Sequence, residues 1–225
     1  MNRRVLAALL VITIMFALAP CATADEVPGD TVLASVGDAT VTYDMAHIYV
    51  LQNEAAKAVI RQYGYAEYAD GLPVMDAEQA VRELATLAGV MLLAKQSGIS
   101  VPEEELRTLV REELVDYPTD EGADYFRDYA EAMLHGYGGS AEALIESTIP
   151  VKAVTVYTEK YILSLLDAHK DGRASDAAAA STHKALEEGL SALVIEKRFP
   201  EAGVIQPAMD MLDDNIQVLR RYAVQ

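Results

Sequence analysis

Cysteine, tryptophan and histidine are scarce in this sequence. Among 225 residues there is one cysteine, Cys21, there are four histidines, and tryptophan does not occur. A single cysteine excludes a disulfide within the chain, and no histidine stands at metal-ligand spacing from another histidine or a cysteine. A nucleophile elbow, a phosphate-binding glycine loop and a dinucleotide fingerprint are also missing. These absences predict a protein that is not an enzyme and that uses no metal or cofactor.

Positive charge is scarce as well. The chain has 18 Lys and Arg against 35 Asp and Glu, which gives a net charge of −17. Contacts to phosphate need clustered cations, and an anionic membrane surface attracts basic segments. We therefore expect no nucleic-acid partner and no membrane docking driven by charge.

Long apolar runs are missing except at the N-terminus. Two arginines there precede an uncharged apolar run from Val5 to Ala19, and the small residues Ala22 and Ala24 follow at the positions that a signal peptidase reads. This order is typical of a secretory signal peptide. We expect residues 1–24 to be removed and the protein to be extracytoplasmic, that is, secreted, periplasmic or at the cell surface.

A rival interpretation of the same segment is a lipoprotein signal. The run Leu18-Ala19-Pro20-Cys21 resembles the box in which a bacterial cysteine is lipidated, although Pro20 departs from the small residue usual at that position. Lipidation of Cys21 would tether the protein to a membrane, whereas cleavage after Ala24 would remove the cysteine.

The remaining chain has the composition of a globular protein, with 52% hydrophobic residues. Alternating apolar residues with a turn at Gly37-Asp38 predict a β-hairpin over 31–42, and Thr42 can cap the helix that follows. The periodicity predicts a mainly α fold, with helices over 43–63, 77–97, 102–117, 121–135, 140–170, 183–198 and 207–223. A tyrosine-rich loop should separate the first two, Pro118 should stop the third, and Pro150 should kink or split the fifth.

The joint between the second and third helices has the clearest signals. Gly98 is the residue that a helix prefers just past its end. Pro102 suits the first position of the next helix, and Glu103 to Glu105 place negative charge at the positive end of its dipole.

Three parts are expected after the signal peptide. Residues 25–170 should form one helical domain, residues 171–182 a linker or a frayed helix start, and residues 183–225 C-terminal helices that pack back on the same domain.

Two stretches together resemble the N-terminal chaperone domain of the SurA family of extracytoplasmic folding factors, and PrsA-type foldases share the pattern. They are VLASVGDATVTYDMA at 32–46 and LATLAGVMLLAKQSGISVPEEELRTLV at 84–110. The resemblance covers about residues 31–115 and implies binding of polypeptides. Many relatives also carry a parvulin prolyl isomerase domain, and no matching β-α pattern occurs here, so isomerase activity is not implied.

These observations favour a secreted, non-enzymatic chaperone-like protein that binds unfolded or nascent secreted polypeptides. The chain holds 12 Tyr and 8 Met, side chains that adapt to varied apolar partners, although most of them are expected in the core. The candidate contacts are Tyr63, Tyr65, Tyr68, Tyr125, Tyr129 and Met133. The alternatives are an assembly protein with one dedicated partner and a degenerate prolyl isomerase, and a homodimer is left open.

Overall fold

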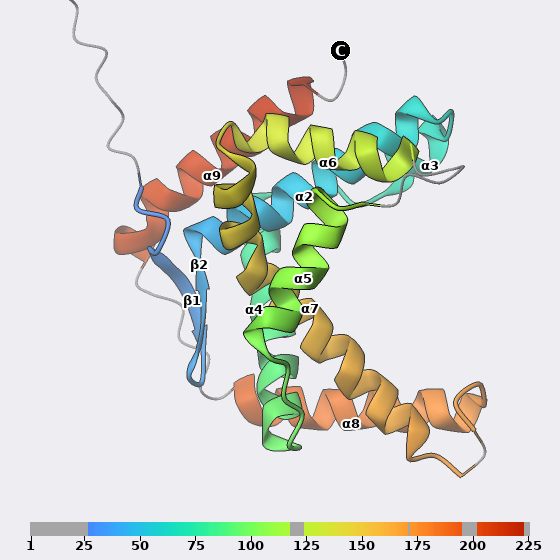
Figure 1. Cartoon of the computed structure of the whole chain (residues 1–225). Helices are drawn as coiled ribbons and strands as arrows, with labels where there is room; N and C mark the ends of the chain where they lie inside the picture. The colour runs from blue at the N-terminus through green and yellow to red at the C-terminus, as the bar shows by residue number, and fades with distance from the viewer. Residues whose placement is uncertain (1–26, 118–123, 171, 195–201, 223–225) are drawn as a thin grey trace, which may run out of the picture.

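The structure is a computed structural model that describes residues 27–117, 124–170, 172–194 and 202–222. The expected signal peptide, with Cys21, Ala22 and Ala24, lies outside the described residues, as does Pro118. The described part holds eight helices and one two-stranded antiparallel sheet, so the mainly α fold with an N-terminal hairpin is confirmed (Figure 1). None of its helices combines the length and the apolar character that a membrane-spanning helix needs.

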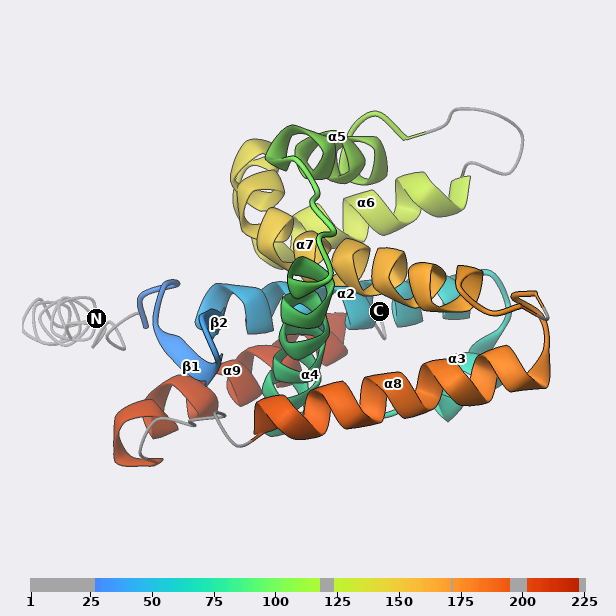
Figure 2. The same ribbon diagram turned by 90° about the horizontal axis from the view of Figure 1, so that it is seen from below.

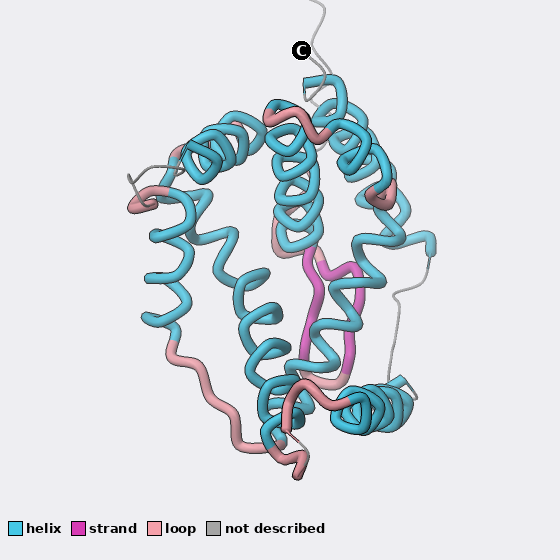
Figure 3. Tube along the Cα trace, turned by 90° about the vertical axis from the view of Figure 1, so that its right-hand side faces the viewer, coloured by secondary structure: helices cyan, strands magenta, loops and turns pink. Residues whose placement is uncertain are grey.

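The hairpin pairs β1 (Val32–Val36) with β2 (Ala39–Thr42). Its turn contains Gly37 at a φ of 54°, a left-handed conformation that glycine adopts without steric cost. The buried side chains of both strands pack against helix α4 (Ala77–Gln96), and Figure 3 shows the hairpin in magenta among the helices. A two-stranded hairpin is only marginally stable by itself in water, and this packing stabilises it by covering its apolar face.

Helices α2 (Tyr43–Gln62) and α4 form the centre of the fold. Each begins at the predicted cap: the Thr42 hydroxyl accepts a hydrogen bond from the Met45 amide (3.3 Å), and the Asp76 carboxylate accepts one from the Gln79 amide (2.8 Å). Helix α6 (Asp124–Tyr137) packs on α2, while α7 (Ala141–Asp167) packs on α4 and on α5 (Glu103–Leu114). The largest fully buried side chains include Leu33, Ile48, Leu51, Leu84, Leu144, Ile145, Leu212 and Ile216.

The joint between α4 and α5 differs from the prediction by one residue. Gly98 has a φ of 83°, as expected. Pro102, however, is the extended residue before α5 rather than its first helical residue, and the helix begins at Glu103. The amide of Val101 is occupied elsewhere, because it donates to the hydroxyl of Tyr157 on α7 at 3.1 Å. A side chain from α7 therefore satisfies an amide that the helix itself leaves without a partner.

Several predicted boundaries are wrong. The expected loop after α2 contains a short helix, α3 (Ala66–Gly71), and α5 ends at Leu114 rather than near residue 117. Residues 176–182, expected as part of a linker or as a frayed helix start, form the first turns of α8 (Asp176–Val194). The reason is local: the Ser175 hydroxyl accepts from the Ala178 amide (3.1 Å), and the alanine-rich run after it favours a helix. Helix α9 (Ala202–Tyr222) likewise begins before Pro207 and contains it.

Pro150 bends helix α7 without splitting it. The helix is continuous from Ala141 to Asp167, and it changes direction along its length in both views (Figures 1 and 2). Proline removes the hydrogen bond to the carbonyl four residues earlier and clashes with the preceding turn, which explains the bend.

The two C-terminal helices lie against different parts of the fold. Helix α8 packs on α4 and α7, and Figure 2 shows it running back alongside the second half of α7. Helix α9 packs on α2, α4 and β1. Polar contacts attach it: the Asp213 carboxylate accepts from the Ala77 amide at the start of α4 (2.8 Å), and the Asn215 amide donates to the Tyr43 hydroxyl (2.7 Å).

We expect His47 to make the stability of this fold sensitive to pH. Its ring is partly buried on α2 beside Tyr43; burial lowers its pKa, and the Asp44 carboxylate opposes this effect. The folded state therefore prefers the neutral imidazole, while the unfolded chain takes up a proton below about pH 6.5. The free energy of unfolding should fall as the pH drops below this value, and the substitution His47→Gln should reduce that fall. An NMR titration midpoint for His47 at or above about 6.5 would contradict the prediction.

Candidate polypeptide-binding surface

Exposed aromatic side chains gather where α2 ends. Tyr63 follows the last residue of α2, Tyr65 precedes α3, and Tyr68 lies on α3; their exposed fractions are 41%, 67% and 65%. Figures 1 and 2 show the end of α2, α3 and the start of α6 at one end of the molecule. We call Tyr63, Tyr65 and Tyr68, together with the partly exposed Tyr125 and the exposed Phe126 on α6, the aromatic surface. Large apolar side chains left in water at one place are typical of an interaction site.

The ring of Tyr125 contacts two other rings of the aromatic surface. The ring centroids of Tyr63 and Tyr125 are 6.0 Å apart and those of Tyr125 and Phe126 are 5.7 Å apart, both with edge-to-face geometry. Such pairs favour a fixed arrangement of rings. Tyr65 and Tyr68 lie at the same end of the molecule, with no ring contact to these three among the described residues. The sequence-based prediction missed Phe126, which is 44% exposed; its position directly after Tyr125 was the available signal.

Polar groups border the three rings. The Tyr63 hydroxyl and the Gln62 side-chain amide both donate to the Asp128 carboxylate, at 3.2 and 3.1 Å. Partial burial and this carboxylate raise the pKa of Tyr63, so its hydroxyl stays protonated and remains a donor. Arg127 pairs with Asp124 and Asp128 at the same helix start. A partner would therefore meet apolar ring faces with a polar border, which is the usual composition of a binding surface.

Two of the six predicted contacts lie elsewhere. Tyr129 is largely buried between α5 and α6; burial and the nearby Glu113 carboxylate raise the pKa of its hydroxyl. Met133 has no exposed surface and belongs to the main core. The prediction that Met133 touches a partner is therefore wrong for the folded protein. Both residues share a helix stripe with Tyr125, which is itself only partly exposed.

The position of Met133 predicts a stability effect without a binding effect. Met133→Ala removes a fully buried side chain and should lower the free energy of unfolding by about 2 kcal/mol. The affinity of the remaining folded protein for an unfolded polypeptide should not change. Urea unfolding and a binding titration of the same variant would check both statements. A loss of affinity in a fully folded sample would contradict this prediction and indicate that Met133 takes part in binding.

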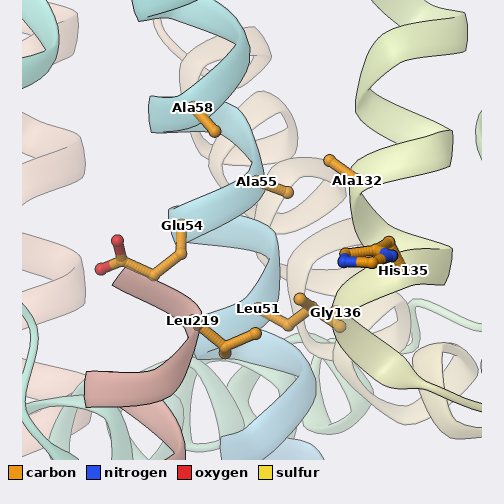
Figure 4. A pocket seen from close by; sticks show the side chains of 8 residues that line it. All are labelled: Leu51, Glu54, Ala55, Ala58, Ala132, His135, Gly136 and Leu219. Atoms are coloured by element: carbon orange, nitrogen blue, oxygen red, sulfur yellow. The ribbon is translucent and has the colours of Figure 1, made fainter. Parts of the chain in front are cut away.

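A small cavity lies between α2, α6 and α9, as Figure 4 shows. It has a volume of about 90 Å³ and is lined by Leu51, Glu54, Ala55, Ala58, Ala132, His135, Gly136 and Leu219. The Glu54 side chain turns its carboxylate away from Ala55 and Ala132, so the cavity wall is mainly apolar (Figure 4). Cofactor sites are usually several times larger. The cavity has room for a small apolar side chain.

The described residues hold no group of three or more histidine, cysteine or acidic side chains arranged to bind a metal ion. No protein-family model, curated protein or solved structure matches the chain.

Proposed function

We propose that this chain is an extracytoplasmic, non-enzymatic chaperone-like protein that binds unfolded or nascent secreted polypeptides. The observation that carries the proposal is the aromatic surface, which leaves several tyrosines and Phe126 in water at one end of the molecule. A folded partner would need a matching shape, whereas an unfolded chain can adapt its apolar side chains to these rings. The expected signal peptide supports the extracytoplasmic location.

The chemistry of the surface suits many different clients. Tyrosine presents an apolar ring and a polar hydroxyl, so it binds varied segments without requiring one sequence. Burial of client side chains would contribute about 25 cal/mol per Å² before the entropy of ordering the client is subtracted. The net charge of −17 keeps the chaperone copies apart in solution. Weak and broad affinity is the expected outcome.

The resemblance to the SurA N-terminal domain supports the same proposal independently. The quoted stretches form β1, β2 and the start of α2, and then α4, the Gly98 joint and α5. These elements surround the core on which α2 is fixed, and α2 carries Tyr63 at its end.

The direct test is the aggregation of an unrelated unfolding protein with and without the purified chain. Near-stoichiometric amounts should suppress aggregation, and circular dichroism must show that the added chain is folded and helical. Absence of suppression by a folded chain would contradict a general chaperone and favour one dedicated partner, which a pull-down could identify. Acceleration of proline isomerisation in a short peptide would contradict the non-enzymatic part of the proposal.

A further inference from the structure

A second pocket lies beside Glu54, and it concentrates positive charge. It is lined by Glu54, Lys57, Arg61, Ala69, Asp70, Leu72, Val74 and Arg220, and its volume is about 360 Å³. We call it the basic pocket. Three of its eight lining residues are cationic and two are acidic, although acidic residues outnumber cationic ones in the chain by 35 to 18. The local excess of positive charge is therefore opposite to the charge of the whole protein.

Contacts within the protein hold the cations in place. Lys57 Nζ donates to the carbonyl of Pro73 at 2.5 Å and lies 3.9 Å from Glu54 Oε1. Arg220 pairs through Nε with Glu54 at 3.4 Å, and its Nη2 donates to the Met75 carbonyl. The Lys57 side chain is only 8% exposed. Partly buried and preorganised cations attract an anion more strongly than flexible surface cations do, because water screens them less.

Arg61 is the cation with the most freedom to bind a ligand. Its Nε and Nη2 both donate to Asp70 Oδ1, at 3.1 and 2.8 Å, and the Asp70 side chain is 64% exposed. Among the hydrogen bonds of the described residues, Arg61 Nη1 takes part in none. An exposed ion pair contributes little stability, so a ligand carboxylate can share or displace Asp70 at small cost.

The rest of the pocket wall is apolar. Ala69, Leu72 and Val74 provide this wall. Ala69 and Asp70 stand on α3, the same short helix that carries Tyr68 of the aromatic surface. A ligand for this pocket would combine a carboxylate with an adjacent apolar group, and it would be attached to something that reaches the tyrosines.

We propose that the basic pocket binds the C-terminal carboxylate of a client polypeptide whose last residue is apolar. This inference rests on the proposed function and adds a specificity to it. A polypeptide C-terminus places a carboxylate directly beside a side chain, which suits Arg61 next to Leu72 and Val74. The preceding residues of the client would lie across Tyr65 and Tyr68.

The test uses fluorescent peptides that share one unstructured sequence ending in leucine. Each peptide is titrated with the full chain, and binding is measured by fluorescence anisotropy. The peptide with a free C-terminus should bind about tenfold more tightly than the same peptide with a C-terminal amide, because a charge-assisted pair is lost. Arg61→Gln should remove most of this difference. Arg221→Gln, which changes an exposed arginine next to Arg220 but outside the pocket, should preserve it.

The outcomes show whether the C-terminal site fails alone or the chaperone proposal fails with it. Equal binding of the two peptides would overturn the C-terminal site and leave the chaperone proposal standing. Binding of neither peptide would overturn both. A third peptide carries the amide and an internal glutamate; if it binds as tightly as the free acid, the pocket accepts any carboxylate and the inference fails.

Discussion

Replacement of Tyr63, Tyr65, Tyr68 and Tyr125 by serine is expected to weaken binding of an unfolded polypeptide about a hundredfold. Truncation of an aromatic anchor at an interface often costs more than about 1 kcal/mol, and a loss of about 3 kcal/mol over the four positions corresponds to this factor. The fold should survive, because three of the four side chains are more than 40% exposed. Anisotropy titrations with a labelled, unstructured peptide would measure the loss.

A matched control uses other exposed apolar side chains. Val32, Leu163 and Val218 are exposed on β1, α7 and α9 and are not part of the aromatic surface. Their joint replacement by serine should leave the affinity unchanged. If this control loses as much affinity as the tyrosine variant, binding depends on general surface hydrophobicity and the aromatic surface is not the site. Phe126→Ser added to the tyrosine variant should weaken binding further.

Arg220→Met should lower the free energy of unfolding by about 3 kcal/mol. The Glu54 carboxylate is only 5% exposed and faces Arg220 Nε at 3.4 Å and Lys57 Nζ at 3.9 Å. Removal of one partner leaves a buried charge poorly compensated, which typically costs several kcal/mol. The Met75 carbonyl also loses its Arg220 donor. Because Lys57 stays in place, the loss should lie at the lower end of the usual range.

The control for this prediction is the neighbouring arginine. Arg221 is exposed, so Arg221→Met should change stability by less than about 0.5 kcal/mol. Adding Glu54→Gln to Arg220→Met removes the uncompensated carboxylate but leaves the buried Lys57 ammonium without an acidic partner. A double-mutant cycle would quantify how strongly Arg220 and Glu54 are coupled. Urea unfolding followed by circular dichroism is the measurement. Equal stability of Arg220→Met and Arg221→Met would show that the pair contributes nothing.

Helix starts and turns could be predicted from the sequence because their causes are local. Thr42, Asp76 and Ser140 each accept a hydrogen bond from the amide three residues later, and these capping side chains can be recognised in the sequence by their position just before an apolar helical pattern. Gly98 ends α4 through its own backbone conformation. The hairpin follows from an alternation and a turn within 12 residues. Ser175 was missed, although its signal is of the same kind.

The candidate site could be predicted only in part. Tyr63, Tyr65 and Tyr68 were found because they cluster in the sequence near Gly64 and Gly71, which interrupt the helices. Tyr125 and Met133 lie on one face of α6 at helical spacing, so periodicity cannot distinguish an exposed residue from a core residue. That distinction depends on which neighbouring helix covers each turn of α6.

The basic pocket could be predicted from the sequence even less well than the aromatic surface. Glu54 and Lys57 stand in an ordinary amphipathic helix, and nothing near them in the chain indicates that both are buried. Arg220 reaches Glu54 across a separation of 166 residues.

The sequence by itself determined the mainly α fold, the hairpin, the caps and the region rich in exposed tyrosines, because these depend on residues a few positions apart. The tertiary structure decided that Met133 is core, that Phe126 is surface and that three cations share one pocket. Burial and pairing depend on helices that meet after long stretches of chain, and the packing of α9 on α2 is the contact that brings Arg220 to Glu54.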